Sequence, residues 1–337
     1  MLSRAYADYV RDLRQPAGDP GTFYVDAELA PQRLTARQAL EAAADAPSLA
    51  AHLAAVRRMN PLYEALRRGL AAWRAAGGSD PAQERLIRAN LDRARAIPAD
   101  PGRRFILVDA AGARLWLYED GRVVDTMRAI VGKPSQQTPA MAGLIRFAVL
   151  NPYWNLPQDL VPGRIVRHVL SQGPDYLQKQ RMEILSDYTP AARRLAASEV
   201  DWPAVAAGTQ RLRVRQLPGA GNMMGKVKFM MPNRLGIYLH DTPDKSSFGR
   251  ADRRLSSGCV RVEDAERLAR WLFGGRGVRV AGAAPEQRVD LPAPVPVYIT
   301  YLTAAPAEGG GIAFQADAYG RDPAWLARLD AKAAPAT

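Results

Sequence analysis

The chain has 337 residues, enough for two domains that each bury a core of their own. It carries 46 basic and 34 acidic side chains, a net charge of +12, which favours an anionic partner such as nucleic acid, a phospholipid surface or a carboxylate-rich polymer. Nucleic acid is disfavoured because no basic run is interleaved with aromatic residues, and no stretch approaches the ~18 apolar residues of a membrane span. The single cysteine excludes an internal disulfide and a cysteine-based zinc cluster.

Residues 1–100 are predicted to form a helical scaffold domain. Thr35 and Gln38 have the spacing of a capping box, Asn60-Pro61 and Asp80-Pro81 suit helix starts, and apolar residues recur at helical spacing after each proline. His52 lies within such a helix, and we expect it to have a structural role. The N-terminus is amphipathic and charged, unlike a signal peptide, and begins as if within a helix. An exported protein would therefore need a leader upstream of residue 1.

After residue 100 the apolar period changes from 3.6 to 2, which predicts a β-rich domain over residues 101–283. Strands are expected at 104–109, 113–119, 122–131, 144–150, 209–216, 227–230, 235–240 and 277–281. With little helical material between the strands, hairpins are favoured over a parallel α/β sheet. A helix is predicted at 263–273. Residues 284–337 should add strands at 295–302 and 311–315 and a short helix, packed on the preceding domains. The expected fold class is α+β, with a sandwich-like β domain.

Residues 151–200 interrupt the strand pattern. The segment is rich in proline and aromatic residues and has a helix-like stretch from Pro174 to Leu185. We interpret it as an inserted lid subdomain that could position a substrate, although a passive packing role is nearly as compatible with the sequence. His168 lies in this insertion.

The stretch from Tyr238 to Val262 carries the candidate chemistry. His240 ends a strand-like run, and Cys259, the only cysteine, follows nineteen positions later after a polar loop. A thiol is a strong nucleophile as thiolate, and a nearby imidazole can accept its proton. Gly258 allows backbone N–H groups to turn toward a developing oxyanion. The alternative is a small buried thiol, but the polar Ser-Ser-Gly context and nearby Arg261 weigh against it.

These motifs resemble those of the L,D-transpeptidases, specifically the larger periplasmic branch with a helical scaffold. The matching pieces occur in order over most of residues 60–330. One departure is Ser257, where many members have histidine, so no second imidazole flanks the thiol. The pieces are Val131-Gly-Lys-Pro with Thr138-Pro, Asn151-Pro-Tyr-Trp-Asn-Leu-Pro, Pro218-Gly-Ala-Gly-Asn-Met-Met-Gly-Lys-Val-Lys-Phe, Tyr238-Leu-His-Asp-Thr-Pro, Ser256-Ser-Gly-Cys-Val-Arg-Val and Asp317-Ala-Tyr-Gly-Arg-Asp.

The resemblance implies that the protein cross-links peptidoglycan stem peptides in the periplasm or cell envelope, without a metal or cofactor. Cys259 would form a thioester with the third residue of a tetrapeptide stem, and the amine of a second stem would resolve it as a 3→3 cross-link. Carbapenem β-lactams would acylate the same thiol. His240 would act as the base, and backbone N–H groups at Gly258 and Cys259 would bind the oxyanion.

The remaining candidate site residues are assigned less specific roles. We expect a backbone carbonyl near Asp241, rather than its carboxylate, to fix the imidazole tautomer. Arg261 could bind a stem carboxylate, with support of the loop the favoured role. Asn222 could contact substrate or brace the thiol loop, and the sequence does not separate the two. Tyr238 could line the pocket, although an aromatic at a strand position is more often core. Ser257 is expected to lie beside the bound substrate.

Three other functions are alternatives to L,D-transpeptidation. A thiol hydrolase would use the same acyl-enzyme with water as acceptor, trimming stems or releasing lipoprotein. An inactive wall-binding scaffold would keep the fold, but the presence of both His240 and Cys259 disfavours it. A papain-like protease is disfavoured because its cysteine normally precedes its histidine, and the order here is reversed.

Overall fold

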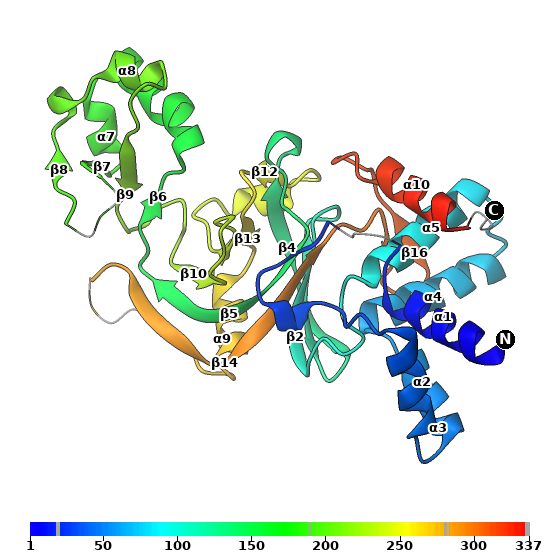
Figure 1. The fold of residues 1–337 in the computed structure, drawn as a ribbon. Coiled ribbons are helices and arrows are strands. Elements are labelled where there is room, and N and C mark those ends of the chain that lie inside the picture. The colour runs from blue at the N-terminus through cyan, green and yellow to red at the C-terminus, as the bar shows by residue number, and fades with distance from the viewer. Residues whose placement is uncertain (18–20, 188, 190, 280–281, 283, 334–337) are drawn as a thin grey trace.

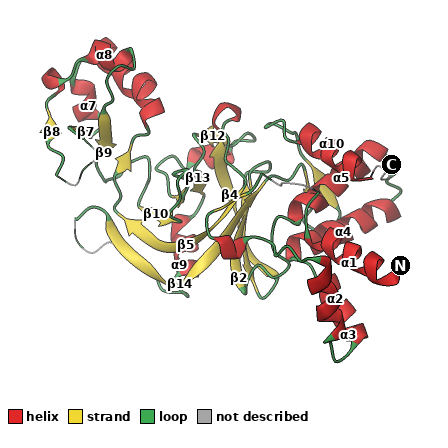
Figure 2. Cartoon of the chain, in the orientation of Figure 1, coloured by secondary structure: helices red, strands yellow, loops and turns green. Residues whose placement is uncertain are grey.

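A computed structural model describes residues 1–17, 21–187, 189, 191–279, 282 and 284–333. Helices gather at the N-terminal end of the molecule, a strongly curved sheet forms its centre, and a smaller lobe of mixed structure projects from the opposite side (Figures 1 and 2). The α+β class predicted from the sequence is therefore confirmed, with the N-terminal helices preceding a β-rich domain.

The N-terminal helices begin at residues whose side chains cap them. Thr35 and Gln38 form the predicted capping box, and Asn60 and Asp80 accept N–H groups of the helices that start at the following prolines. Tyr6 and His52 join two of the helices through a 2.7 Å hydrogen bond. The helices are α1 (Leu2–Arg14), α2 (Ala36–Ala44), α3 (Leu49–Arg57), α4 (Pro61–Ala75) and α5 (Pro81–Ala94), with a 3-10 turn at Ala27–Leu29.

The central sheet has ten strands, and its order is β1-β5-β10-β11-β13-β4-β3-β2-β14, with β12 beside β4. Because β14 pairs with β2 and also with β5, it closes the sheet on itself. The strands are β1 (Phe23–Tyr24), β2 (Arg104–Asp109), β3 (Arg114–Glu119), β4 (Arg122–Gly132), β5 (Met141–Leu150), β10 (Val227–Met230), β11 (Leu239–His240), β12 (Arg254–Ser256), β13 (Val260–Val262) and β14 (Gln287–Thr300).

Two apolar cores hold the sheet and the helices together. One fills the inside of the curved sheet and includes Phe229, Leu239 and Val260, together with one face of α9 (Ala265–Leu272). The other joins α4 and α5 to the outer face of β2, β3 and β14, for example through Leu66 and Phe105. The hydrophobic effect thus fixes the helical scaffold against the side of the sheet opposite to the inner core.

The insertion forms a lobe with its own small sheet of order β6-β9-β7-β8 and its own apolar core. The strand predicted at 209–216 forms as β9, but it pairs with β6 and β7 in this lobe, so the lobe continues past residue 200. Its elements are β6 (Trp154–Asn155), a π-helical turn (Pro162–Val166), α6 (Arg167–Gln172), α7 (Asp175–Lys179), β7 (Met182–Leu185), β8 (Arg194–Leu195), α8 (Trp202–Ala206) and β9 (Arg213–Gln216).

Several predicted elements are corrected by the structure. The helix expected from Pro174 to Leu185 ends at Lys179, and Met182–Leu185 is strand β7 because its residues pair with β8 and β9. The strand expected at 235–240 is reduced to Leu239–His240, since Gly236 has a positive φ of 65° in a turn held by the Asn233 side chain. Residues 277–279 form no strand, and 280–281 lie outside the described residues.

The chain ends with a hairpin and a helix that lie against the scaffold (Figure 1). They are β15 (Ala304–Pro306), β16 (Ile312–Phe314) and α10 (Asp322–Ala333). None of the helices in the described ranges combines the length and apolar composition that a bilayer crossing requires. Within the same ranges, no three His, Cys, Asp or Glu side chains come together as ligands for a metal ion.

Candidate active site

Three neighbouring strands bring the candidate residues together. Lys228 on β10 lies opposite His240 on β11, and His240 lies beside Arg261 on β13. Side chains at registered positions of neighbouring strands point to the same face of a sheet, so these three form one row. The Val260 N–H donates to the Tyr238 carbonyl at 3.2 Å, which extends the register toward Cys259. By the two-residue period, Tyr238 and Cys259 face the same side as this row.

The Cys259 thiol is half-buried and reduced. Its sulfur donates a hydrogen bond to the Gly236 carbonyl at 3.5 Å. Burial raises the pKa of the thiol, and hydrogen bonds from the backbone and side chain of Tyr238 and the charge of Arg261 oppose that rise. The free protein therefore holds a neutral thiol rather than a preformed thiolate.

The His240 ring is buried, with 2% of its surface exposed. Nδ1 lies 2.5 Å from the backbone carbonyl of Asp241. A carbonyl oxygen only accepts, so Nδ1 carries the ring proton and Nε2 keeps the lone pair that a base needs. Burial, followed by the charge of Arg261, lowers the pKa of His240 to about 3. The imidazole is consequently neutral at physiological pH.

The Asp241 carboxylate is directed away from the imidazole. It accepts the Lys226 N–H at 2.8 Å and pairs with the Lys245 ammonium at 2.6 Å. Of the two groups that Asp241 offers, it is therefore the carbonyl that contacts the ring. The carboxylate joins Lys226, just before β10, to Lys245, which follows β11.

The turn before the thiol depends on Gly258, which has a φ of 114°. A Cβ at this position would also lie 3.2 Å from the Ile237 Cδ1 atom, so glycine suits both the conformation and the space. The Gly258 N–H donates to Ser256 Oγ at 3.2 Å, whereas the Cys259 N–H donates no hydrogen bond to any residue that the structure describes. Of the two predicted oxyanion donors, only the Cys259 N–H lacks a partner in this state.

Further hydrogen bonds hold the thiol loop, residues 256–259, in place. Ser256 Oγ donates to the Cys259 carbonyl at 2.6 Å, and Thr138 Oγ1 donates to the Gly258 carbonyl at 2.8 Å. The Thr138 carbonyl in turn accepts from Arg321 at 2.9 Å. Ser257, at the tip of this loop, is exposed to solvent.

Arg261 is half-buried on the same side of the strands as the thiol. Its Nε is buried without a hydrogen-bond partner, and it forms no ion pair with the described residues. Burial lowers the pKa of Arg261, the charge of Arg164 in the insertion lowers it further, and Asp244 opposes the change. The positive charges of Arg164 and Arg261 thus act on each other, and an anion bound at Arg261 would offset that repulsion.

Tyr238 connects the site to the insertion. Its hydroxyl donates to the Met224 sulfur at 3.4 Å, and its ring lies edge-on to His240 with centroids 5.7 Å apart. Burial raises the pKa of Tyr238, and the neighbouring Cys259 raises it further. Because Tyr238 also packs against the core of the insertion, that lobe borders the candidate site.

Asn222 lies at the base of the insertion and is buried. Its amide donates to the carbonyls of Pro152, Gln216 and Leu217, and its Oδ1 accepts the Met224 N–H at 2.7 Å. These bonds join the two chain segments that connect the insertion to the sheet, rather than the thiol loop. His168 stacks on Tyr176 within the insertion, with ring centroids 4.8 Å apart.

Sequence reasoning missed two charged residues: Lys228, which lies beside His240, and Arg164 in the insertion, whose charge acts on Arg261. Lys228 has 9% of its side chain exposed and pairs with Glu286 at 3.2 Å, and its charge contributes to the lowered pKa of His240. Alternation with Val227 and Phe229 could have placed Lys228 on the polar face, but its position beside His240 follows only from the strand order. Arg164 had no comparable signal in the sequence.

Comparison with known families gives two matches along the chain. Residues 103–291 match the YkuD family, described as the L,D-transpeptidase catalytic domain, and residues 1–70 match a family described as the Scaffold domain. A Haemophilus influenzae protein named "Putative L,D-transpeptidase" is 33% identical over 244 residues, which cover 69% of this chain and 47% of that protein. The chain thus spans about half the length of this curated relative.

Solved L,D-transpeptidase structures show weaker similarity. The enzyme from Mycobacterium smegmatis is 14% identical, with a TM-score of 0.29 over 58% of each chain. The enzyme from Enterococcus faecium is 13% identical, with a TM-score of 0.28 over 60% of this chain and 52% of that one. The family assignment depends instead on the catalytic-domain match, which covers more than half of the 337 residues. The chain belongs to the L,D-transpeptidase family.

Proposed function

We propose that this protein is a peptidoglycan L,D-transpeptidase that forms 3→3 cross-links through a thioester on Cys259. The observation that carries the proposal is the placement of Cys259 and His240 on one face of paired strands, with the ring proton of His240 held at Nδ1 by the Asp241 carbonyl. This leaves the Nε2 lone pair for proton transfer, as nucleophilic catalysis by a thiol requires.

In the acylation step, the Cys259 sulfur attacks the carbonyl carbon of the third stem residue, and the thiol proton passes to His240 Nε2. The oxyanion that forms would accept the N–H of Cys259, with the Gly258 N–H joining if it leaves Ser256. Collapse of this intermediate breaks the C–N bond, and the imidazolium gives its proton to the leaving D-alanine amine. A thioester and a neutral imidazole result.

In the second step, the side-chain amine of another stem attacks the thioester carbonyl, and His240 accepts its proton. The C–S bond breaks, and the imidazolium returns the proton to the sulfur. Because burial and the charges of Arg261 and Lys228 disfavour the imidazolium, it should exist only while paired with the negative charge of the reacting groups. His240 is therefore suited to hold a proton only briefly during the reaction.

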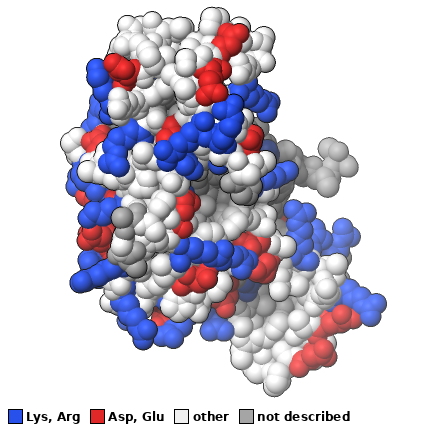
Figure 3. Space-filling model, turned by 90° about the vertical axis from the view of Figure 1, so that its left-hand side faces the viewer, with Lys and Arg blue, Asp and Glu red and all other residues white. Residues whose placement is uncertain are grey.

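The proposed substrate carries carboxylates, and the site has cations to bind them. Arg261 lies on the same side of the strands as the thiol and has a buried Nε with no partner, and the positive charge of Arg164 in the insertion acts on it. Lys and Arg side chains are also spread over the face formed by the insertion and the adjoining end of the sheet (Figure 3). We propose that the insertion acts as a lid that positions the acceptor stem, and that the protein works in the cell envelope.

Incubation of the protein with purified tetrapeptide muropeptides, followed by mass spectrometry, tests this function. We expect dimers whose masses correspond to loss of one D-alanine per cross-link. Trimmed monomers without dimers would instead identify an L,D-carboxypeptidase.

A carbapenem provides a separate test of the nucleophile. We expect a mass adduct of one carbapenem per chain that is absent in Cys259→Ala. If the unsubstituted protein forms no adduct and no product, the catalytic proposal is wrong and an inactive wall-binding role is favoured.

A further inference from the structure

A cavity of about 410 Å³ lies between α5, α10, β5 and β14, and Cys259 and His240 are not among its lining residues. This is within the range of small-molecule sites, which are commonly ~300–1,000 Å³. Its wall includes Ile97, Met141, Tyr298 and Trp325, so most of the surface available to a ligand is apolar or aromatic.

The charged wall of this cavity is formed by arginines alone. Arg93, Arg321 and Arg328 line it, and no Asp or Glu is among its lining residues. Arg321 is turned partly toward the thiol side, where it donates to Gln137 and to the Thr138 carbonyl. An anion that enters this cavity would therefore meet positive charge and no facing carboxylate.

Arg93 is the distinctive group, because only 4% of its surface is exposed. Its Nη1 pairs with Asp322 at 2.6 Å, and its guanidinium lies 5.6 Å from the Tyr301 ring centroid and 5.2 Å from that of Trp325. Its Nη2 is buried and has no hydrogen-bond partner. A buried donor without a partner typically costs about 1–3 kcal/mol, a penalty that a bound acceptor would remove.

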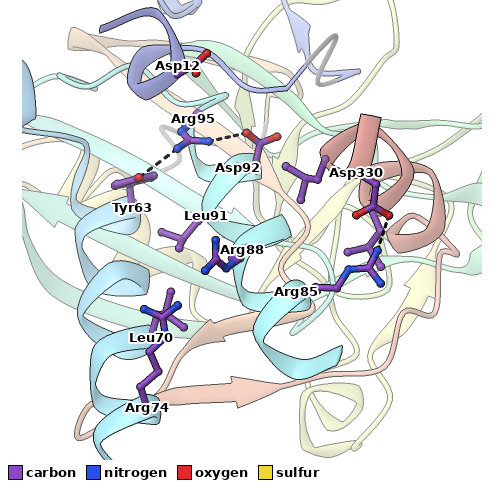
Figure 4. A pocket seen from close by; sticks show the side chains of 12 residues that line it. Asp12, Tyr63, Leu70, Arg74, Arg85, Arg88, Leu91, Asp92, Arg95 and Asp330 are labelled. Atoms are coloured by element: carbon purple, nitrogen blue, oxygen red, sulfur yellow. Dashed lines mark hydrogen bonds and ion pairs between the residues drawn. The ribbon is translucent and has the colours of Figure 1, made fainter. Parts of the chain in front are cut away.

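A second arginine-rich pocket, on the other side of α10, provides a contrast (Figure 4). There each guanidinium is already paired with a carboxylate: Arg74 and Arg88 with Glu84, Arg85 with Asp330, and Arg95 with Asp92. Its charges are therefore balanced within the protein. Asp12, Asp92 and Asp330 also line that pocket, whereas no Asp or Glu lines the smaller cavity, so of the two the smaller cavity is the better place for an anion.

We propose that the cavity containing Arg93 binds a small carboxylate attached to an apolar or aromatic body. A carboxylate needs few donors, and the Nη2 group of Arg93 offers a short, charge-assisted hydrogen bond. The aromatic walls would cover the rest of the ligand. A phosphate is disfavoured because several of its oxygens would lose water beside apolar side chains without gaining donors. This site is separate from the thiol and from the stem peptide proposed to react there.

Ligand-observed NMR on the whole chain tests the proposal, with phenylacetate as the probe and phenylacetamide as its neutral counterpart. We expect saturable binding of phenylacetate with a Kd of about 1 mM or tighter, and at least about tenfold weaker binding of the amide. Inorganic phosphate should not compete with the probe. Equal binding of acid and amide, competition by phosphate, or no saturable binding of phenylacetate would each overturn the assignment.

Two exposed alanines on α10 give a matched pair of variants. Ala324 lines the cavity, whereas Ala327 lies on the same helix but is not among the lining residues. Ala324→Glu should weaken phenylacetate binding by about tenfold or more through charge repulsion, and Ala327→Glu should leave it within about twofold. Arg93→Gln should also weaken binding, with circular dichroism used to verify its fold. Similar affinities for the two alanine variants would contradict the proposal, whether or not Arg93→Gln folds.

Discussion

The two faces of β10, β11 and β13 differ sharply in composition. On the inner face, Phe229, Leu239 and Val260 have no exposed surface and belong to the main apolar core. On the outer face, the same strands present Lys228, His240 and Arg261 in one row. Alternation along each strand separates the two sets of side chains, so one set stabilises the sheet while the other can carry chemistry.

Burial has opposite consequences on the two faces of these strands. On the inner face, burial of apolar surface contributes directly to folding. On the outer face, burial lowers the pKa of His240 and raises that of Cys259, so both groups are held neutral. Substitutions on the outer face should therefore change catalysis more than stability, and those on the inner face the reverse.

Replacement of the thiol should have the largest effect on activity. Cys259→Ala should reduce turnover of tetrapeptide muropeptides by at least about 10³-fold, because the chain has no other thiol to form the thioester. The melting temperature should change by less than ~3 °C, since the thiol is only half-buried. Thermal denaturation followed by circular dichroism checks this, and a much larger drop would indicate a packing role for the sulfur.

Replacement of His240 should have the second-largest effect on activity. His240→Ala should slow acylation by a carbapenem by about 10²–10⁴-fold, the usual contribution of a general base, as measured by stopped-flow absorbance. His168→Ala is the matched control, because that histidine stacks on Tyr176 within the insertion, and its rate should match the unsubstituted protein. A near-normal acylation rate in His240→Ala, together with a reduced rate in His168→Ala, would identify His168 in the insertion as the base.

A substitution on the inner face, next to His240, should lower stability much more than activity. Leu239→Ala removes a fully buried side chain and should lower the free energy of unfolding by about 2–5 kcal/mol in urea denaturation. At a temperature where the variant remains folded, its acylation rate should stay within about tenfold of the original. A loss of rate as large as that of His240→Ala would show that the two faces are not separable.

Acid should reveal the buried imidazole as a gradual loss of stability that is small for each pH unit. Burial lowers the pKa of His240 from 6.5 to about 3, so between these values the unfolded chain binds a proton that the folded chain does not. The free energy of unfolding contributed by this group should not depend on pH above 6.5, should fall by about 1.4 kcal/mol per pH unit between pH 6.5 and about 3, and should level off below that. Urea titrations at a series of pH values should show this slope reduced in His240→Asn. The same slope in both proteins would place the effect elsewhere.

Much of the architecture could be predicted from local patterns. The capping box at Thr35 and the prolines at 61 and 81 indicated helix starts that the structure has, and the period-2 run at 104–109 is strand β2. The predictions were wrong where long-range pairing decides the conformation. Met182–Leu185 is a strand because β8 and β9 lie beside it, and Pro292 and Pro294 of β14 are accommodated where its register shifts between Asp290 and Val295.

The sequence by itself determined which residues could carry the chemistry, because a lone cysteine after Ser-Ser-Gly and a histidine at the end of a strand-like run are local features. It also determined the family, through motifs in a fixed order. The row formed by Lys228, His240 and Arg261 and the burial of Arg93 with an unpartnered nitrogen follow from the tertiary structure alone, whereas the contact between the Asp241 carbonyl and the ring was already expected from the sequence. Strand order and the packing of helices against a sheet bring together residues far apart in the chain, and local patterns do not encode those contacts.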